Sequence, residues 1–162
     1  MKIVVTGDTH IRNKNKQLPE CLLKECESAD LIIHTGDWVS MEVHKILSEY
    51  AKVVGVHGNV DGDGVREHFN AKELFEVNGF KIGVVHGDGE KRTTEKRVLE
   101  AFEEEGTDII IFGHSHIPML RYVKKVMLMN PGSPTDKRKL PYYSYGILHI
   151  DEHFRAEIVM FD

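Results

Sequence analysis

The sequence predicts an α/β fold, in which strands and helices alternate through the first half and strands make up most of the last forty or so residues. Short runs rich in valine and isoleucine recur along the chain, and most of them end at a glycine, which is typical of strands. Apolar residues recur at helical spacing between the early runs. Because the strand runs are almost continuously apolar, we expect sheets packed together with helices outside them.

Eight short apolar runs are expected to form the strands. Their length and their content of β-branched residues favour strands over helices. In chain order they are KIVVTG (2–7), LIIHTG (31–36), KVVGVHG (52–58), KIGVVHG (81–87), DIIIFG (108–113), KVMLMNPG (125–132), YGILHI (145–150) and AEIVMF (156–161).

Three helices are expected between the earlier strands. Ser40 is a candidate N-cap for the second helix, and the third should begin near Thr93 or Thr94 and end at Gly106. The apolar residues that define the three helices lie in residues 22–29, 43–50 and 98–102.

The bulk composition is that of one ordinary globular domain spanning residues 1–162, with 41% hydrophobic and 29% charged residues. The net charge of −5 argues against non-specific binding to nucleic acid. The sequence leaves a specific nucleic-acid partner and a homo-oligomer open. Basic clusters, interpreted as solvated surface that could also steer an anionic substrate, comprise Arg12, Lys14 and Lys16; Lys91, Arg92, Lys96 and Arg97; and Lys137, Arg138 and Lys139.

The cysteine content and the apolar runs indicate a reducing, aqueous environment. Cys21 and Cys26 lie five residues apart in an expected helix, which turns them away from each other, and they match no paired zinc-site spacing. We expect reduced thiols on or near the core. The N-terminal stretch lacks a signal-peptide apolar region, and no run reaches the ~18 apolar residues of a membrane span. A cytoplasmic protein with no membrane partner is therefore expected.

Chemically active side chains follow five of the expected strands, each beside a glycine. Ligands bind outside the carboxyl ends of the strands in α/β sheets, so these side chains should converge on one cleft. They are Asp8 and His10 after the first strand, Asp37 after the second, Asn59 after the third, His86 after the fourth, and His114 and His116 after the fifth.

This set of side chains indicates a centre with two metals. Carboxylate, carboxamide and imidazole ligands without thiolate suit Mn, Fe, Zn or Ni. Seven ligands are too many for one tetrahedral metal, but they suit two metals that share a bridging carboxylate. Two divalent ions stay positively charged overall even after the charges of Asp8, Asp37 and a bridging hydroxide are subtracted. A phosphate ester, which is an anion, is therefore the expected substrate.

The order of these residues resembles the signature of the calcineurin-like metallophosphoesterases. The matching segments are GDTH, HTGD, HGNVDG, VVHGD and FGHSH, and NPGSP at 130–134 resembles a later family element. The compact length is similar to that of the small YfcE-type phosphodiesterase branch, which also resembles the retromer subunit of the same fold. The resemblance implies a four-layer α/β/β/α sandwich of two mixed β-sheets flanked by helices.

The resemblance also implies how the metals are held. Asp8, His10, Asp37 and His116 would bind the first metal, and Asp37, Asn59, His86 and His114 the second, with Asp37 bridging. No side chain would act as nucleophile, because a metal-bound hydroxide attacks phosphorus; Asp37, Asn59 and His86 would act through the metals. Mn²⁺ is the favoured metal, with Ni²⁺, Fe²⁺ and Zn²⁺ as alternatives, and a small phosphodiester is the expected substrate.

One position departs from the family pattern. Many members carry GNHD, whose histidine contacts the phosphate and can assist the leaving group, and Val60 stands in that place here. The main alternative function is a non-catalytic interaction scaffold of the same fold. Because all seven ligand positions are intact, the enzyme is favoured. Metallo-β-lactamases and amidohydrolases are excluded by the order of the histidine motifs, and a calcium loop at 59–70 by the asparagines at its first and twelfth positions.

Several neighbouring residues have roles that the sequence leaves open. His34 and His57 could each orient a ligand or be an ordinary core or edge histidine. Asp61 could support Asn59 or stabilise its turn. Asp88 is interpreted as structural. The histidines expected at the surface are His44, His68, His149 and His153.

Overall fold

The first sheet is built on three parallel strands that correspond to the first three apolar runs. The computed structural model describes residues 1–12 and 17–162, so Lys14 and Lys16 of the predicted basic cluster lie outside the described residues. An antiparallel pair of C-terminal strands completes this sheet beside β1. The strand order is β10 (Phe154–Phe161), β9 (Tyr143–Ile150), β1 (Lys2–Thr6), β2 (Leu31–His34) and β3 (Lys52–Gly55).

The second sheet is also mixed, with three parallel central strands and an antiparallel strand at each edge. The two edge strands, β4 and β7, were not predicted. Both carry charged residues and are only partly buried, so they lack the apolar runs of central strands. The strand order is β4 (Lys72–Val77), β5 (Phe80–Val85), β6 (Ile109–Phe112), β8 (Val126–Asn130) and β7 (Met119–Val123).

The three predicted helices are present, and a short fourth one is added. The N-cap at Ser40 is confirmed, because its side chain accepts a hydrogen bond from the Glu42 amide. Thr93 likewise caps the last helix by accepting from the Lys96 amide. The helices are α1 (Glu20–Cys26), α2 (Met41–Ser48), α3 (Asp63–Arg66) and α4 (Thr94–Ala101).

The predicted end of the last helix at Gly106 is wrong. Helix α4 ends at Ala101, and turns continue to Gly106, where φ is +63°. The glutamates at 103–105 supply a physical reason, since acidic side chains at a helix C-terminus oppose the helix dipole. The one-turn helix α3 was not predicted because its four residues are too few to show a period.

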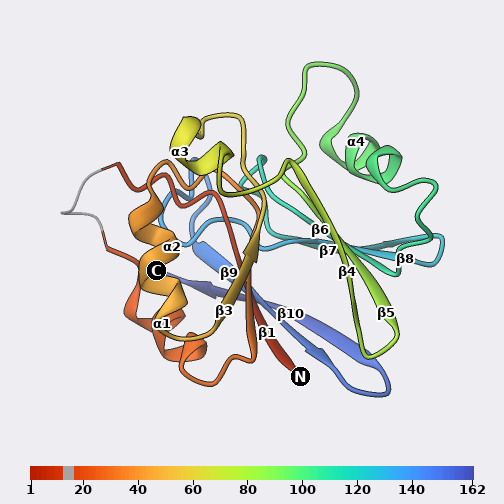
Figure 1. The fold of residues 1–162 in the computed structure, drawn as a ribbon, viewed down its shortest axis with the longest axis horizontal. Helices are drawn as coiled ribbons and strands as arrows, with labels where there is room; N and C mark the ends of the chain where they lie inside the picture. Colours follow the sequence, from red (N-terminus) through yellow and green to blue (C-terminus); the bar gives the residue numbers. More distant parts are fainter. Residues whose placement is uncertain (13–16) are drawn as a thin grey trace.

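Three apolar layers confirm the predicted four-layer sandwich (Figure 1). The central cluster joins the two sheets, with Ile3 and Ile33 from one facing Ile82 and Ile111 from the other. A second cluster packs α1 and α2 against the first sheet, and a third packs α4 against the second sheet. Cys26 is buried in the second cluster while Cys21 is exposed, and both are free thiols. None of the described helices is long and apolar enough to cross a membrane.

Candidate metal centre

The carboxyl ends of the parallel strands from both sheets meet at one edge of the sandwich, as the sequence predicted. Each of the seven predicted ligands lies within hydrogen-bond or ion-pair distance of another one. The first sheet supplies Asp8, His10, Asp37 and Asn59, and the second supplies His86, His114 and His116. The chemistry therefore depends on both sheets.

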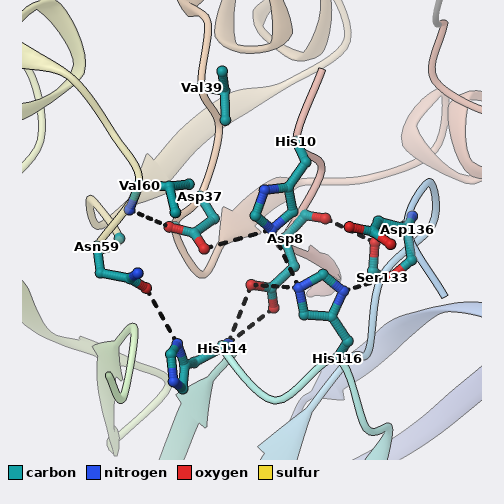
Figure 2. Close-up of polar contacts among 12 residues, drawn as sticks. Asp8, His10, Asp37, Val39, Asn59, Val60, His114, His116, Ser133 and Asp136 are labelled. Atoms are coloured by element: carbon teal, nitrogen blue, oxygen red, sulfur yellow. Dashed lines mark hydrogen bonds and ion pairs between the residues drawn. The ribbon is translucent and has the colours of Figure 1, made fainter. Parts of the chain in front are cut away.

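One group of side chains surrounds the end of β1. Asp8, His10 and His116 offer ligand atoms that all lie within 4.8 Å of one another. Nε2 of His10 lies 3.2 Å from Nε2 of His116, and that nitrogen lies 3.6 Å from Oδ1 of Asp8 (Figure 2). Two imidazole nitrogens that face each other beside a carboxylate fit a shared cation.

A second group consists of Asp8, Asp37 and His86, whose ligand atoms also lie within 4.8 Å of one another. Oδ2 of Asp37 lies 3.5 Å from Nε2 of His10 and 3.3 Å from Nε2 of His86. One oxygen of the Asp37 carboxylate thus lies close to a nitrogen from each group. Asp8 belongs to both groups by distance, so the assignment of the bridge to Asp37 stays a prediction.

Asn59 and His114 extend the second group. Oδ1 of Asn59 lies 3.2 Å from Nε2 of His86 and 3.2 Å from Nδ1 of His114. The amide of His114 in turn donates to Oδ2 of Asp8 at 2.9 Å. This backbone contact ties the loop after β6 to the loop after β1 across the two sheets.

The backbone that carries the predicted ligands is strained. Left-handed φ values are uncommon outside glycine, although Asp, Asn and His adopt them more readily than other residues. Each such residue costs on the order of 1–3 kcal/mol and persists only where the surroundings enforce it. Five of the seven ligands have φ values between +46° and +68°: Asp8, His10, Asp37, His114 and His116.

The buried carboxylate of Asp61 holds two of these loops together. It accepts hydrogen bonds from the amides of Asp37 at 2.9 Å, Gly58 at 2.7 Å and Val39 at 2.7 Å. The amide of Val39 is held although its φ of +68° is unfavourable for a β-branched residue. Asp61 therefore acts on the loop after β2 as well as on its own turn.

Gly58 is required by its close approach to Asp37. A Cβ atom at this position would lie 2.0 Å from Oδ1 of Asp37. The same oxygen accepts a hydrogen bond from the Val60 amide at 3.1 Å (Figure 2). The glycine thus lets the loop after β3 wrap directly around the carboxylate that stands between the two groups.

Burial and charge set the protonation of the carboxylates and of His86. Burial raises the pKa of Asp8 to about 7. Burial alone would lower the pKa of His86, but its hydrogen bond to Asp37 and the nearby carboxylates raise it to about 9. The pKa of Asp37 falls to about 2, because the effect of burial is outweighed by the hydrogen bond and charge of His86.

The other three histidines of the centre favour the neutral form. Burial lowers the pKa of His10, His114 and His116 below the ordinary value. A neutral imidazole is the form that binds metals. With two carboxylates, one carboxamide and four imidazoles, the donor set fits divalent transition metals.

Comparisons with known proteins assign the family. The sequence model of the calcineurin-like phosphoesterase superfamily domain matches residues 1–153. The chain belongs to the calcineurin-like phosphoesterase superfamily. The predicted family is therefore confirmed, and the seven residues lie in a metallophosphoesterase.

Named relatives agree with this assignment. A probable metallophosphoesterase of Methanocaldococcus jannaschii is 36% identical over 98% of this chain and 81% of its own length. A phosphodiesterase of the same organism is 28% identical over 82% of this chain and 83% of its own length. Vps29 of Entamoeba histolytica, in a crystal structure of its complex with Zn²⁺, has the same fold, with a TM-score of 0.76, 24% identity and complete coverage of both chains.

Two of the predicted histidine ligands are oriented by backbone carbonyls that the sequence did not reveal. Nδ1 of His86 donates to the carbonyl of Thr35 at 2.8 Å, and Nδ1 of His116 donates to the carbonyl of Asp136 at 2.5 Å. Each contact leaves Nε2 directed at the centre, as in metal sites whose ligands are held from behind. Every residue has a backbone carbonyl, so the identity of the accepting residue gives no signal in the sequence.

The loop after β8 was also underestimated. Ser133 Oγ donates to the carbonyl of Asp8 at 2.7 Å, and Thr135 Oγ1 donates to the carbonyl of Thr9 at 2.5 Å. The NPGSP segment at 130–134 contains Ser133, and in the sequence this segment served only as part of the family resemblance. In this metallophosphoesterase the segment supports the first ligand loop.

His34, whose role the sequence left open, contacts the loops that carry predicted ligands. It is fully buried, its ring stacks on Trp38 at 3.5 Å, and burial lowers its pKa well below the ordinary value. Its Nδ1 accepts from the Gly36 amide at 3.2 Å, which leaves Nε2–H to donate to Thr9 Oγ1 at 3.2 Å. One neutral side chain thus connects the loops after β1 and β2.

The remaining positions that the sequence singled out differ in exposure. His57 is half-buried, and its Nδ1 lies 3.4 Å from the carbonyl of Gly58. Asp88 is exposed. Of the four histidines expected at the surface, His68 and His153 are exposed, whereas His44 and His149 are half-buried.

Proposed function

We propose that this metallophosphoesterase hydrolyses small phosphodiesters at a dinuclear metal centre, with activated water as the nucleophile. The position of the Asp37 carboxylate carries the proposal, because its Oδ2 lies 3.5 Å from a nitrogen of His10 and 3.3 Å from one of His86. A carboxylate between two groups of nitrogen ligands suits a pair of bridged metals.

The proposed ligands divide as the family resemblance implies. Asp8, His10, Asp37 and His116 would hold the first metal, and Asp37, Asn59, His86 and His114 the second. When bound, two divalent ions, with Mn²⁺ favoured over Ni²⁺, Fe²⁺ and Zn²⁺, would polarise the phosphoryl oxygens and activate water. The contacts from Thr35 to His86 and from Asp136 to His116 would keep the ligand nitrogens in place for this chemistry.

Two observations support a diester over a monoester. One relative with 28% identity is named a phosphodiesterase. The side chain of Val60, 40% exposed beside Asp37, stands where many family members carry a histidine. Valine can neither protonate a leaving group nor balance the second charge of a monoester, so a diester with a good leaving group is the proposed substrate.

The alternative is an interaction scaffold of the same fold, and the likeness to Vps29 keeps it in view. The two candidates differ in turnover. A scaffold would bind metal or partner protein without hydrolysing any phosphodiester. The intact set of seven ligand residues favours the enzyme.

The test is a metal-reconstitution assay. The protein is stripped with a chelator, reloaded with Mn²⁺ or Ni²⁺, and assayed on bis-p-nitrophenyl phosphate and p-nitrophenyl phosphate, with metal content measured by elemental analysis. We expect activity to disappear on stripping and to return with about two metals per chain. Full activity in the stripped protein, or two bound metals without any turnover, would overturn the proposal.

A further inference from the structure

The loop after β8 brings a cationic side chain to the edge of the first ligand group. The loop is anchored where Ser133 and Thr135 donate to the backbone carbonyls of Asp8 and Thr9. Asp136 continues it and accepts from Nδ1 of His116 through its carbonyl (Figure 2). The next residues are therefore held at a fixed distance from the centre.

Arg138 is the residue that this anchoring places at the centre. Its Nη2 lies 3.3 Å from Nε2 of His116, and its Nε lies 3.4 Å from Oδ2 of Asp136. Its backbone has a φ of +52°, a conformation that arginine rarely adopts. The side chain is 58% exposed, so the guanidinium contacts a predicted ligand while it remains open to solvent.

The neighbouring basic residues of the same loop do not share this position. Lys137 donates to the carbonyl of Pro141 at 3.0 Å, and its Nζ lies 4.7 Å from the ring centroid of Tyr143. Lys139 is exposed. Of these three basic residues, Arg138 is the one that contacts a histidine of the centre, which separates it from general surface charge.

The charge of Arg138 indicates what it binds. A guanidinium is always protonated and has no lone pair to offer a metal. A divalent metal on Nε2 of His116 would lie close to this positive charge, and an anion between the two cations would offset their repulsion. The planar fork of donors matches the oxygens of a phosphoryl group.

We propose that Arg138 binds the phosphoryl oxygens of the substrate and contributes to the preference for phosphate esters. The inference rests on the proposed function, because it assumes that the substrate is a phosphate ester held at the same centre. Asp136 serves as the tether that orients the guanidinium, and the carbonyl of the same residue orients His116.

The test measures phosphate binding and metal content separately. The parent protein, Arg138→Ala, Arg138→Lys and the matched control Lys139→Ala are loaded with Mn²⁺, and the affinity for inorganic phosphate is measured from the ³¹P relaxation caused by the bound Mn²⁺. We expect Arg138→Ala to weaken phosphate binding by about tenfold or more and to raise KM for the diester. Arg138→Lys should fall between, because lysine keeps the charge but loses the fork.

Elemental analysis and thermal melting accompany each variant. We expect the metal content and the melting temperature of Arg138→Ala to equal those of Lys139→Ala. Equal phosphate affinity in the parent and Arg138→Ala would overturn the inference, as would a metal-loaded parent that binds no phosphate or a loss of metal that accounts for the weaker binding. Failure of the proposed function is a separate result, because it appears as a parent protein that binds phosphate without hydrolysing any diester.

Discussion

At the residue scale, both halves of the proposed centre depend on Asp37. Asp37→Asn keeps the shape of the side chain but removes the charge that stands between His10 and His86. We expect both metals to bind more weakly and activity to fall by roughly a hundredfold or more, as for the loss of an important metal contact. His116→Ala serves as the comparison and should weaken mainly the first metal. Two tightly bound metals in a fully active Asp37→Asn variant would contradict the bridging role.

Val60 is the residue on which the proposed substrate preference depends. Bis-p-nitrophenyl phosphate should exceed p-nitrophenyl phosphate in kcat/KM, and Val60→His should raise monoester hydrolysis relative to diester hydrolysis. A positioned general acid contributes roughly 10²–10⁴-fold, which sets the upper range of the gain. Faster cleavage of alkyl monoesters than of aryl diesters by the parent protein would show that Val60 does not determine the preference.

Two nearby side chains could have replaced the missing acid, and their surroundings differ. The Asp61 carboxylate is buried and already accepts from three backbone amides, so it has no free position at the leaving group. His57 is half-buried and contacts the carbonyl of its neighbour Gly58. If a His57→Gln variant keeps the pH dependence of kcat, His57 is excluded as the general acid that replaces the missing histidine.

His86 and Asp8 make metal binding depend on pH. The pKa of His86 is raised to about 9 and that of Asp8 to about 7, so at pH 7 His86 is protonated and Asp8 is about half protonated, and a metal must displace these protons. Metal affinity should therefore rise with pH from about 7 to about 9, and the number of protons released on binding should fall over the same range. Titration calorimetry in two buffers of different ionisation enthalpy measures this release, and identical heats in both buffers at pH 7 would count against it.

At the element scale, the loops after β2 and β3 function as one unit because Asp61 joins them. Asp61→Ala would leave the amides of Asp37, Val39 and Gly58 without their acceptor. We expect a loss of roughly 2–4 kcal/mol in the free energy of unfolding, measured by urea denaturation. The matched control is Asp63→Ala, an exposed carboxylate two residues along, which should change stability by less than about 0.5 kcal/mol. Similar losses in both variants would contradict the clamp.

The strands with the plainest sequence signal are those buried on both faces. Strands such as β2 and β6 are buried at every position, and their apolar runs show this directly. The edge strand β4 has the sequence KELFEV, which mixes charged and apolar residues without a continuous apolar run, and it was missed. Asn78 and Gly79, with φ of +49° and +85°, nevertheless form the tight turn that joins it to β5. An Asn-Gly pair between two such segments is a known hairpin signal.

At the scale of the whole molecule, the positions of the seven candidate ligands were predictable because parallel strands deliver their loops to one edge. The backbone contacts that hold those ligands were not predictable, although the sequence did single out His34, Asp61 and the NPGSP segment. Thr35 and Asp136 act through their carbonyls, and Ser133 acts on the carbonyl of Asp8 from a segment more than a hundred residues away. Such contacts depend on how the two sheets stack, which the spacing of residues in the sequence does not contain.

The order of strands in the first sheet has a consequence for synthesis on the ribosome. Strand β1 lies between β2 and β9, so it obtains its second neighbour only after residues 143–150 have been made. Ser133 and Thr135 likewise reach Asp8 and Thr9 late. The loop after β1 therefore lacks the hydrogen bonds from Ser133 and Thr135 until those residues have been synthesised. Metal capture by this protein is expected to follow the synthesis and pairing of β9 rather than to precede it.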